Sequence, residues 1–546
     1  MKISKSSAYI VLYTISIFQG GNFLRKVKVF LLNGILLTLT SLAMQTIGVS
    51  FNVYISNKIG STAVGVYQLV MSVYMFAITL ASSGMNLAIT KVVAEEYASS
   101  NSSYSHSEGN SSYKKHFHST TSDIRKVVKK GLLFSFLFGF TTCVFLYIFS
   151  PFIAKHWLHS QISSAPLKIL AISLPFLSMS SSINGYFSAL RNVKKSAFTQ
   201  VFEQVLKILL ISFLINYFLP DGLEFACISL VLGSTISEIC SFAMLFILYL
   251  FDTKKFNKLA FSNNKKDYSK RILKVSTPIA ITSYIRSGLS TFKQLIVPIQ
   301  LEKSGVSCDY ALSRYGMING MVMPLIMFPC TFMSSFSMLL IPEFSYLHVE
   351  DNYTKINFIL NKIFKICFVF SFLIMGIFWS FSDELSSLIY NEIEIVKFVK
   401  LLSPLIVFMY VDNIIDSILK GLDKQVSVMA INILDLFVSI SFIMFLLPIN
   451  GVLGYIIVLY ISEILNGFCS LFKLIKTTHF KFDFSNWILK PLFTVVFLNI
   501  LFRFLCPTVI TCVPEVIFCI CIYSIFYLGI LILGRTIVKK DITFFK

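Results

Sequence analysis

KVSTPIAITSYIRSGLSTFKQLIVPIQ, residues 274–300, is the stretch of this chain that decides its fold. It is long enough to cross a bilayer as an α-helix, which needs about 20 residues, yet Arg286 and Lys293 lie near its middle. An isolated charge at the centre of a bilayer costs at least ~2.5 kcal/mol, so such a charge normally faces a partner or a water-filled path. Seven residues make two helical turns, which predicts that both cations share one helix face about 10 Å apart.

Two interpretations of this cationic pair stay open on the sequence. Arg286 and Lys293 are either structural cations that carboxylates on neighbouring helices neutralise, or part of a cavity wall that receives an anionic substrate.

The composition indicates a polytopic membrane protein. The 546 residues are 55% hydrophobic and only 14% charged, with a mean hydropathy of +0.76, whereas soluble domains hold about 25% charged residues. The net charge of +20 comes from Lys and Arg in short loops, as the positive-inside rule predicts, and requires no nucleic-acid partner. The 11 cysteines form no metal-binding spacing, and the sequence suggests no metal site and no cofactor.

Hydropathy predicts an all-α integral membrane fold with about fourteen transmembrane helices. Basic residues follow the even-numbered segments, while the odd-numbered connections are nearly uncharged, which places both termini in the cytoplasm of a multi-pass cell-membrane protein. Residues 1–28 are expected to be a weakly structured or amphipathic extension. The predicted spans cover residues 30–53, 63–91, 129–150, 167–190, 197–219, 224–251, 274–300, 311–341, 359–381, 398–419, 426–447, 452–474, 486–506 and 513–534.

An internal repeat divides the chain. The tetrapeptide ISEI occurs at 236–239 and again at 461–464, and Pro175 with Asn184 matches Pro404 with Asn413 without a gap. Such colinear matches predict two six-helix lobes, residues 29–253 and 254–476, followed by an extra helix pair in 477–546.

The repeat sets the seventh span opposite the first. Gln45 and Asn52 are also seven residues apart, so we expect them to face Arg286 and Lys293 across a central cavity. Arg314 completes the predicted set of cavity residues.

Several acidic residues also lie within spans, where an unpaired carboxylate is costly. Glu203 and Lys207 are four residues apart and are predicted to neutralise each other on one helix face. Glu238 and Glu463 occupy equivalent places in the repeat. Further candidates for cation or proton sites, or for structural pairs, are Asp412, Asp416 and Asp435.

Four stretches carry a family resemblance: ISNKIGSTAVGVYQ (55–68), NGYFSALRN (184–192), QVFEQ (200–204) and FSMLLIPEFS (336–345). They resemble the stage V sporulation protein B group of the multidrug, oligosaccharidyl-lipid and polysaccharide (MOP) exporter superfamily, which includes the lipid II flippase MurJ and MATE-like transporters. The resemblance runs from about Phe30 to the C-terminus. It implies two six-helix lobes around a central cavity, with helices thirteen and fourteen at the side.

The resemblance also implies a function. Members usually carry arginines in the first span around an Ile/Leu-Gly pair, whereas this chain has QTIGVSFN at 45–52, with neither cation. Anion binding is therefore expected to depend on Arg286 and Lys293. The expected activity is flipping of an undecaprenyl-diphosphate-linked cell-wall precursor, similar to lipid II of the spore cortex, to the outer leaflet by alternating access.

The alternatives are a cation-coupled multidrug exporter of the same superfamily and an exporter of another polysaccharide or O-unit. A membrane enzyme is disfavoured because the predicted outer loops are short and nearly uncharged. The expected partners are a lipid-linked oligosaccharide, the phospholipid bilayer and enzymes of cell-wall synthesis, with the protein acting as a monomer.

Overall fold

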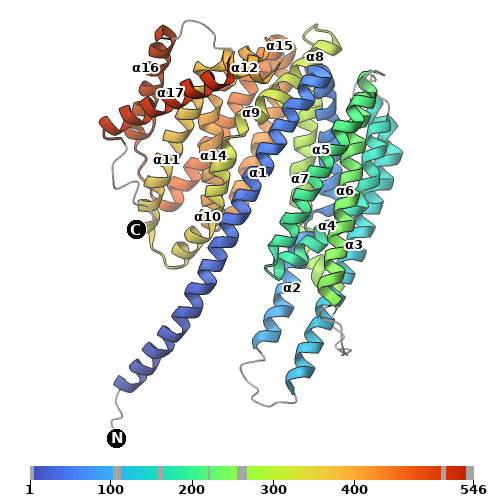
Figure 1. Ribbon diagram of the computed structural model, residues 1–546, viewed down its shortest axis with the longest axis vertical. Helices are drawn as coiled ribbons and strands as arrows, with labels where there is room; N and C mark the ends of the chain where they lie inside the picture. Colours follow the sequence, from blue (N-terminus) through green and yellow to red (C-terminus); the bar gives the residue numbers. More distant parts are fainter. Residues whose placement is uncertain are drawn as a thin grey trace.

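The computed structural model describes residues 5–102, 112–157, 164–218, 222–254, 267–390, 392–505 and 512–536. Within these ranges it describes side chains from residue 40 onward, except at residues 41, 98–102, 112–123, 193, 223, 254, 338, 339 and 505. Every regular element in these ranges is helical. Figure 1 shows long helices running side by side, with α2 to α6 on one side of the molecule and α9 to α17 on the other. The predicted all-α integral membrane fold is confirmed.

Within the described ranges, nine helices are long and apolar enough to cross a membrane, or up to eleven if each bent pair is one span. Two of the long helices contain a break, at Gly60 and at Gly451, where the backbone leaves helical geometry. The helix that holds Arg286 and Lys293 is not one of these nine. The count of fourteen spans stays a prediction.

Helix α1 (Lys5–Ser82) has two limbs, residues 5–59 and 61–82, which meet at Gly60. Gly60 has φ 77°, which a residue without a Cβ adopts freely. We call the end of the molecule at this residue the Gly60 end. Residues 1–28 are predicted to be a weakly structured or amphipathic extension; helix α1 begins within them, at Lys5, and continues into the first span.

The first bundle consists of the second limb of α1 and five further helices. Helix α4 packs against α2, α3 and α6, and α5 packs against α6. The bounds of the five helices are α2 (Met85–Ser102), α3 (Ser112–Trp157), α4 (Ala165–Ala189), α5 (Val193–Phe218) and α6 (Leu223–Lys254).

Helix α7 (Tyr268–Glu302) lies between the two groups of helices. It packs against α1, α2 and α3 and, farther along, against α15 (Gln425–Thr478). One helix therefore contacts both bundles, so its faces meet different surroundings at different depths.

The second bundle contains two bent spans. One comprises α8 (Cys308–Tyr315), the π-helical segment η3 (Gly316–Val322), α9 (Met323–Met327) and α10 (Cys330–Val349), and it bends by 57° between α9 and α10. The other bends by 52° between α13 (Ile395–Leu402) and α14 (Leu405–Gly421). Pro329 and Pro404 begin the helices that follow the bends, as expected because proline interrupts helical hydrogen bonding.

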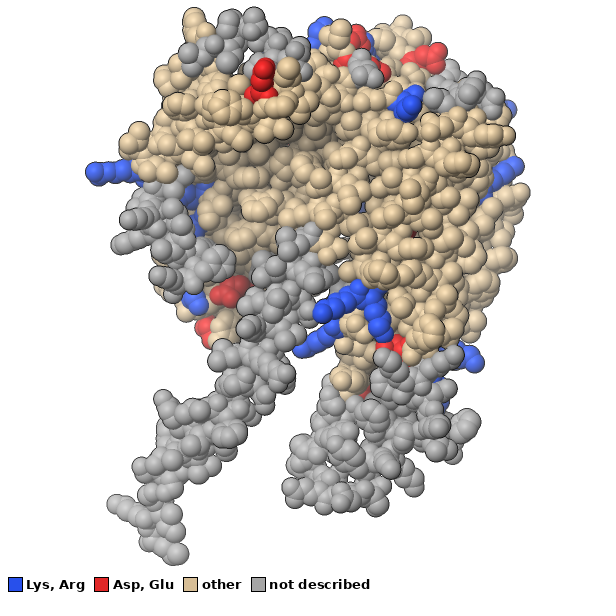
Figure 2. Space-filling model, viewed as in Figure 1, with Lys and Arg blue, Asp and Glu red and all other residues tan. Residues whose placement is uncertain are grey.

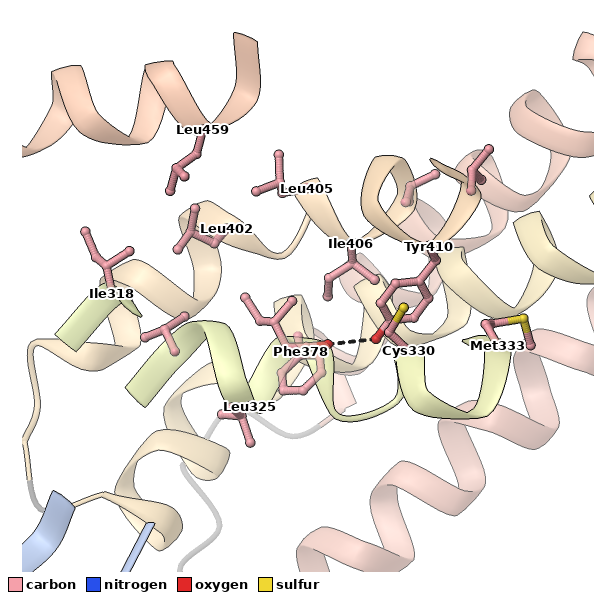
Figure 3. Close-up of a cluster of buried hydrophobic side chains, with 14 of the residues drawn as sticks. Ile318, Leu325, Cys330, Met333, Phe378, Leu402, Leu405, Ile406, Tyr410 and Leu459 are labelled. Carbon is pink, nitrogen blue, oxygen red and sulfur yellow. Dashed lines mark hydrogen bonds between the residues drawn. The ribbon is translucent and has the colours of Figure 1, made fainter. Parts of the chain in front are cut away.

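Tyrosines satisfy the carbonyl groups that these irregular segments leave free. Tyr410 donates to the Ile326 carbonyl oxygen (2.7 Å) beside the α9–α10 bend, and Tyr390 donates to that of Met321 (2.9 Å) in η3. Figure 3 shows Tyr410 within a buried cluster that includes Ile318, Leu405 and other apolar residues. A lipid bilayer offers no water to such carbonyls, so these bonds allow the bent spans to lie within the protein.

The last two helices pack on the outside of the second bundle. α16 (Lys490–Leu505) and α17 (Val513–Leu533), with the π-helical segment η4 (Ser485–Leu489) before them, contact α11 (Tyr353–Ser380). Tyr527 is buried and donates to the Val369 carbonyl oxygen (3.0 Å). The remaining short helix is α12 (Ser382–Ile389).

Apolar side chains cover the middle of the surface. Phe213, Tyr217 and Phe504 are 74%, 73% and 81% exposed. Figure 2 shows a broad uncharged zone, with Lys, Arg, Asp and Glu mainly toward the two ends of the molecule. Such a distribution suits a bilayer rather than water.

Candidate substrate-binding cleft

A cleft of about 520 Å³ lies between the second limb of α1 and the middle of α7. Eight hydroxyl side chains and two glutamines supply most of its polar surface. The lining residues are Gln68, Met71, Ser72, Met75, Ile78, Thr79, Ser82 and Ser83 from the first bundle, and Ser283, Arg286, Ser287, Ser290, Thr291 and Gln294 from α7. The cleft suits a polar ligand rich in hydrogen-bonding groups.

Hydrogen bonds between the two helices fix the walls of the cleft. Ser287 Oγ donates to Thr79 Oγ1 (3.1 Å), and Thr291 Oγ1 donates to the Ser72 carbonyl oxygen (3.0 Å). The second limb of α1 and α7 therefore form one continuous polar wall.

Arg286 is the one charged side chain among the described residues that line the cleft. It is exposed, and its charge interacts with that of Asp416 on α14. A guanidinium offers several N–H donors in a planar fork and stays protonated, so it suits an oxyanion such as a phosphate.

Lys293 is on the same helix but outside the cleft. Its Nζ donates to Ser439 Oγ (3.0 Å) and Ser462 Oγ (3.3 Å), both on α15. Both serines donate in turn to Asp435 Oδ1, and Glu463 adds a second negative charge near the ammonium group. The expectation that Lys293 lines the cavity with Arg286 is not met, because α15 covers α7 at the level of Lys293.

The structure does not bring the other predicted cavity residues to the cleft either. Gln45 is exposed on the first limb of α1. Asn52 donates to the Gly320 carbonyl oxygen (2.7 Å) in η3, which joins the first limb to the second bundle. Arg314 is paired with Glu394, and its guanidinium lies over the Tyr310 ring at 4.4 Å. The Asn52 amide and the Arg314 guanidinium therefore bond with other parts of the protein and do not line the cleft.

The bundles meet closely at the Gly60 end. A Cβ at Gly65 would lie 2.2 Å from the Leu312 carbonyl oxygen, and one at Gly316 would lie 2.0 Å from that of Ser61. Ser61 Oγ and Ser313 Oγ are 2.9 Å apart and share a hydrogen bond. Only glycine allows backbones to approach so closely, and the molecule is closed at this end.

The acidic residues of the first bundle form a separate network. Tyr74 donates to Glu238 Oε2 and also shares a hydrogen bond with Ser173. The charges of Glu203 and Lys207 interact, but no ion pair joins these two described residues. The predicted neutralising pair is thus a looser electrostatic contact.

In the second bundle, carboxylates of α14 meet polar residues of α15. Asn466 Nδ2 donates to Asp412 Oδ2 (3.0 Å), and Asn432 Nδ2 donates to Asp416 Oδ2 (3.5 Å). Lys420 Nζ, on α14 itself, lies 3.9 Å from Asp416 Oδ2. One oxygen of each aspartate is buried without a hydrogen-bond partner among the described residues. These carboxylates do not line the cleft.

Sequence reasoning missed the wall that the first bundle contributes. Five lining residues of this wall recur at intervals of three or four along the sequence: Gln68, Ser72, Met75, Thr79 and Ser82. That periodicity places them on one helix face and is the signal that identifies this wall.

The chain matches two family models. The model described as polysaccharide biosynthesis protein covers residues 30–348, and the MatE model covers residues 306–445. The stage V sporulation protein B of Bacillus subtilis (strain 168) is 26% identical over 434 residues, which are 78% of this chain and 80% of that protein.

Solved structures show the same fold. The lipid II flippase MurJ in an inward closed conformation has a TM-score of 0.63 at 13% identity, covering 93% of this chain and 99% of that chain. A multidrug resistance MATE family transporter of the MOP superfamily, in an inward-facing conformation, has a TM-score of 0.61 at 13% identity, covering 80% of this chain and 96% of that chain.

Helical bundles, an apolar belt and a polar cleft between helices define a multi-pass membrane protein. The chain belongs to the polysaccharide biosynthesis protein family and is similar to stage V sporulation protein B. It shares its fold with the lipid II flippase MurJ and with MATE transporters of the MOP superfamily.

Proposed function

We propose that this protein flips an undecaprenyl-diphosphate-linked cell-wall precursor, similar to lipid II, from the inner to the outer leaflet by alternating access. The observation that carries the proposal is Arg286, the one charged side chain among the described residues that line a cleft of hydroxyl and amide groups. The names of the related proteins, a sporulation protein and a lipid II flippase, support the same substrate class.

Each part of the proposed ligand has a matching surface. The diphosphate would accept charge-assisted hydrogen bonds from Arg286, while the sugar hydroxyls would bond with Ser and Gln side chains of the cleft. The polyprenyl chain would stay in the lipid, because it is wholly apolar. The charge of Arg286 also acts on Asp416 of α14, so a bound diphosphate would share this guanidinium with the carboxylate.

The transport cycle would change which end is closed. The bundles meet at Gly65 and Gly316 here. With the termini in the cytoplasm, as loop charge predicts, the Gly60 end faces outward and the cleft is reached from inside. Rocking of the bundles would break the glycine contact and turn the cleft outward.

We further propose that the aspartates on α14 bind the driving ion or proton. Asp412 and Asp416 each keep a buried oxygen without a hydrogen-bond partner among the described residues. Arg286 lies within electrostatic range of Asp416, so ion or proton uptake there would alter the charge balance that the substrate meets.

The second candidate function is a cation-coupled multidrug exporter. The MatE match and the buried carboxylates favour it, but a cationic drug needs a negative charge at its binding site. Among the described residues, Arg286 gives the cleft a positive charge and no carboxylate lines it.

Translocation of a fluorescent lipid II analogue in proteoliposomes tests the proposal. Arg286→Gln is expected to abolish translocation, while Lys274→Gln, at an exposed position of α7 outside the cleft, is expected to leave it unchanged. Both variants are first checked for equal insertion and thermal stability. Undiminished translocation by Arg286→Gln excludes the anion site, and efflux of a cationic dye without lipid II translocation supports the second candidate instead.

A further inference from the structure

A second concavity, separate from the cleft, lies on α3 at the end opposite Gly60. It has a volume of about 670 Å³, and residues of α3, α4 and the start of α7 line it. Lys126, Lys129 and Lys130 form its basic side. Their spacing of three and four residues places them on one face of α3.

The next turn of α3 gives the concavity an apolar side. Leu133 and Phe136 are 49% and 44% exposed and line it directly below the lysines. Met179 of α4 adds to this apolar surface. A basic group thus stands immediately beside a surface that suits hydrocarbon.

The charge within the concavity is positive. Among the described residues, Asp267 is the one acidic residue that lines it. The Asp267 carboxylate accepts from the Lys270 backbone N–H (3.3 Å) and lies 3.8 Å from Lys270 Nζ. Lys129 and Lys130 are exposed and form no ion pair with any described residue. An anion would therefore find two uncommitted ammonium groups.

We propose that this concavity binds an anionic phospholipid of the phosphatidylglycerol class from the leaflet that the lysine-rich loops face. The phosphate lies among the α3 lysines, and an acyl chain follows Leu133 and Phe136 toward the bilayer centre. Basic pockets between transmembrane helices on the cytoplasmic side recognise anionic headgroups in this way. A zwitterionic lipid carries no net charge and gains much less from the lysines.

The bound lipid would connect parts of the molecule that the transport cycle separates. The concavity joins α3 and α4 to the start of α7. Beside it, Arg271 of α7 forms ion pairs with Glu95 (2.7 Å) and Glu96 (2.5 Å) of α2. A lipid at this place adds to those ion pairs and stabilises the present position of α7.

Lipid binding to the purified full-length protein tests the inference, with native mass spectrometry of added dioleoyl phosphatidylglycerol and dioleoyl phosphatidylcholine. Lys129→Gln/Lys130→Gln is expected to weaken phosphatidylglycerol binding about 30-fold, roughly fivefold for each lysine, and to leave phosphatidylcholine binding unchanged. The matched control, Lys473→Gln/Lys476→Gln on α15, is expected to bind as the wild type does. A benzophenone side chain at position 136 should also cross-link to phosphatidylglycerol.

Equal affinity of the double variant and the wild type for phosphatidylglycerol would overturn the inference, as would equal binding of the two phospholipids by the wild type. Undecaprenyl diphosphate is the competitor that separates a phospholipid from the transport substrate. Phosphatidylglycerol that stays bound supports the inference, and its displacement one for one assigns the concavity to the substrate. None of these outcomes depends on translocation, so the proposed function is tested separately.

Discussion

Replacing Gly316 by alanine should open the Gly60 end. The new Cβ would lie 2.0 Å from the Ser61 carbonyl oxygen, whereas ordinary contacts begin at 3.4 Å, so the backbones must separate by about 1.4 Å. Gly65 N and Cα, at 2.6 and 2.9 Å, leave no flexible side chain to move aside. Overpacking of this kind costs about 1–3 kcal/mol, which shifts the conformational equilibrium about 5- to 150-fold away from this closed state.

Disulfide formation across the contact measures that shift. Ser61 Oγ and Ser313 Oγ are 2.9 Å apart, so Ser61→Cys/Ser313→Cys should cross-link rapidly under mild oxidation in a variant with Cys308 replaced by serine. Adding Gly316→Ala should slow cross-linking at least fivefold and raise the accessibility of both thiols to a water-soluble maleimide.

A matched glycine provides the control. A Cβ at Gly467 on α15 would meet no atom within 4 Å, so Gly467→Ala should leave the cross-linking rate unchanged. Equal rates with and without Gly316→Ala would refute the reasoning, because the closed end would then not depend on the glycine contact.

Two further predictions concern charged residues outside the cleft. Lys293→Met should destabilise the protein by about 3–5 kcal/mol in thermal unfolding, because it leaves buried acidic groups without their cation. Lys293→Met/Asp435→Asn should recover much of that loss. If the effects of the two substitutions on stability simply add, the contact between Lys293 and the Asp435 network is contradicted. At the Gly60 end, the hydrogen bond from Arg314 lowers the pKa of Glu394 below its ordinary value. Its contribution to stability is therefore present above about pH 4.3 and lost as pH falls through the lower folded pKa. Melting curves of wild type and Glu394→Gln should converge over that range, and a constant difference down to pH 3 would count against the pair.

The sequence predicts the helices well because each span must be apolar and must satisfy its own backbone hydrogen bonds. Predicted spans such as 167–190 and 359–381 correspond to single helices, α4 (Ala165–Ala189) and α11 (Tyr353–Ser380). The bends are harder to predict, since proline at position 278 of α7 is accommodated within one helix, while Pro329 and Pro404 lie at bends. Neighbouring tyrosines and packing decide between these outcomes.

The site was predicted only in part. Arg286 was predicted for the cleft and lines it, but the polar face of residues 68–82 was not, because serine and threonine are common on buried helix faces. Asn52 was assigned to the cavity, yet its amide bonds with a carbonyl group in η3. A π-helical segment and the carbonyl it offers arise from the folded chain and have no simple sequence signal.

The stretch 274–300 illustrates what the sequence determined and what only the tertiary structure determined. Sequence alone predicted a helix with two cations seven residues apart on one face, because helical periodicity and the cost of charge in lipid depend only on local chemistry. The tertiary structure decided their surroundings: α7 borders open space at Arg286, but α15 lies against it at Lys293. The reason is physical, since a side chain's partners depend on which helix packs beside it at that depth, and that packing involves residues far away in the chain.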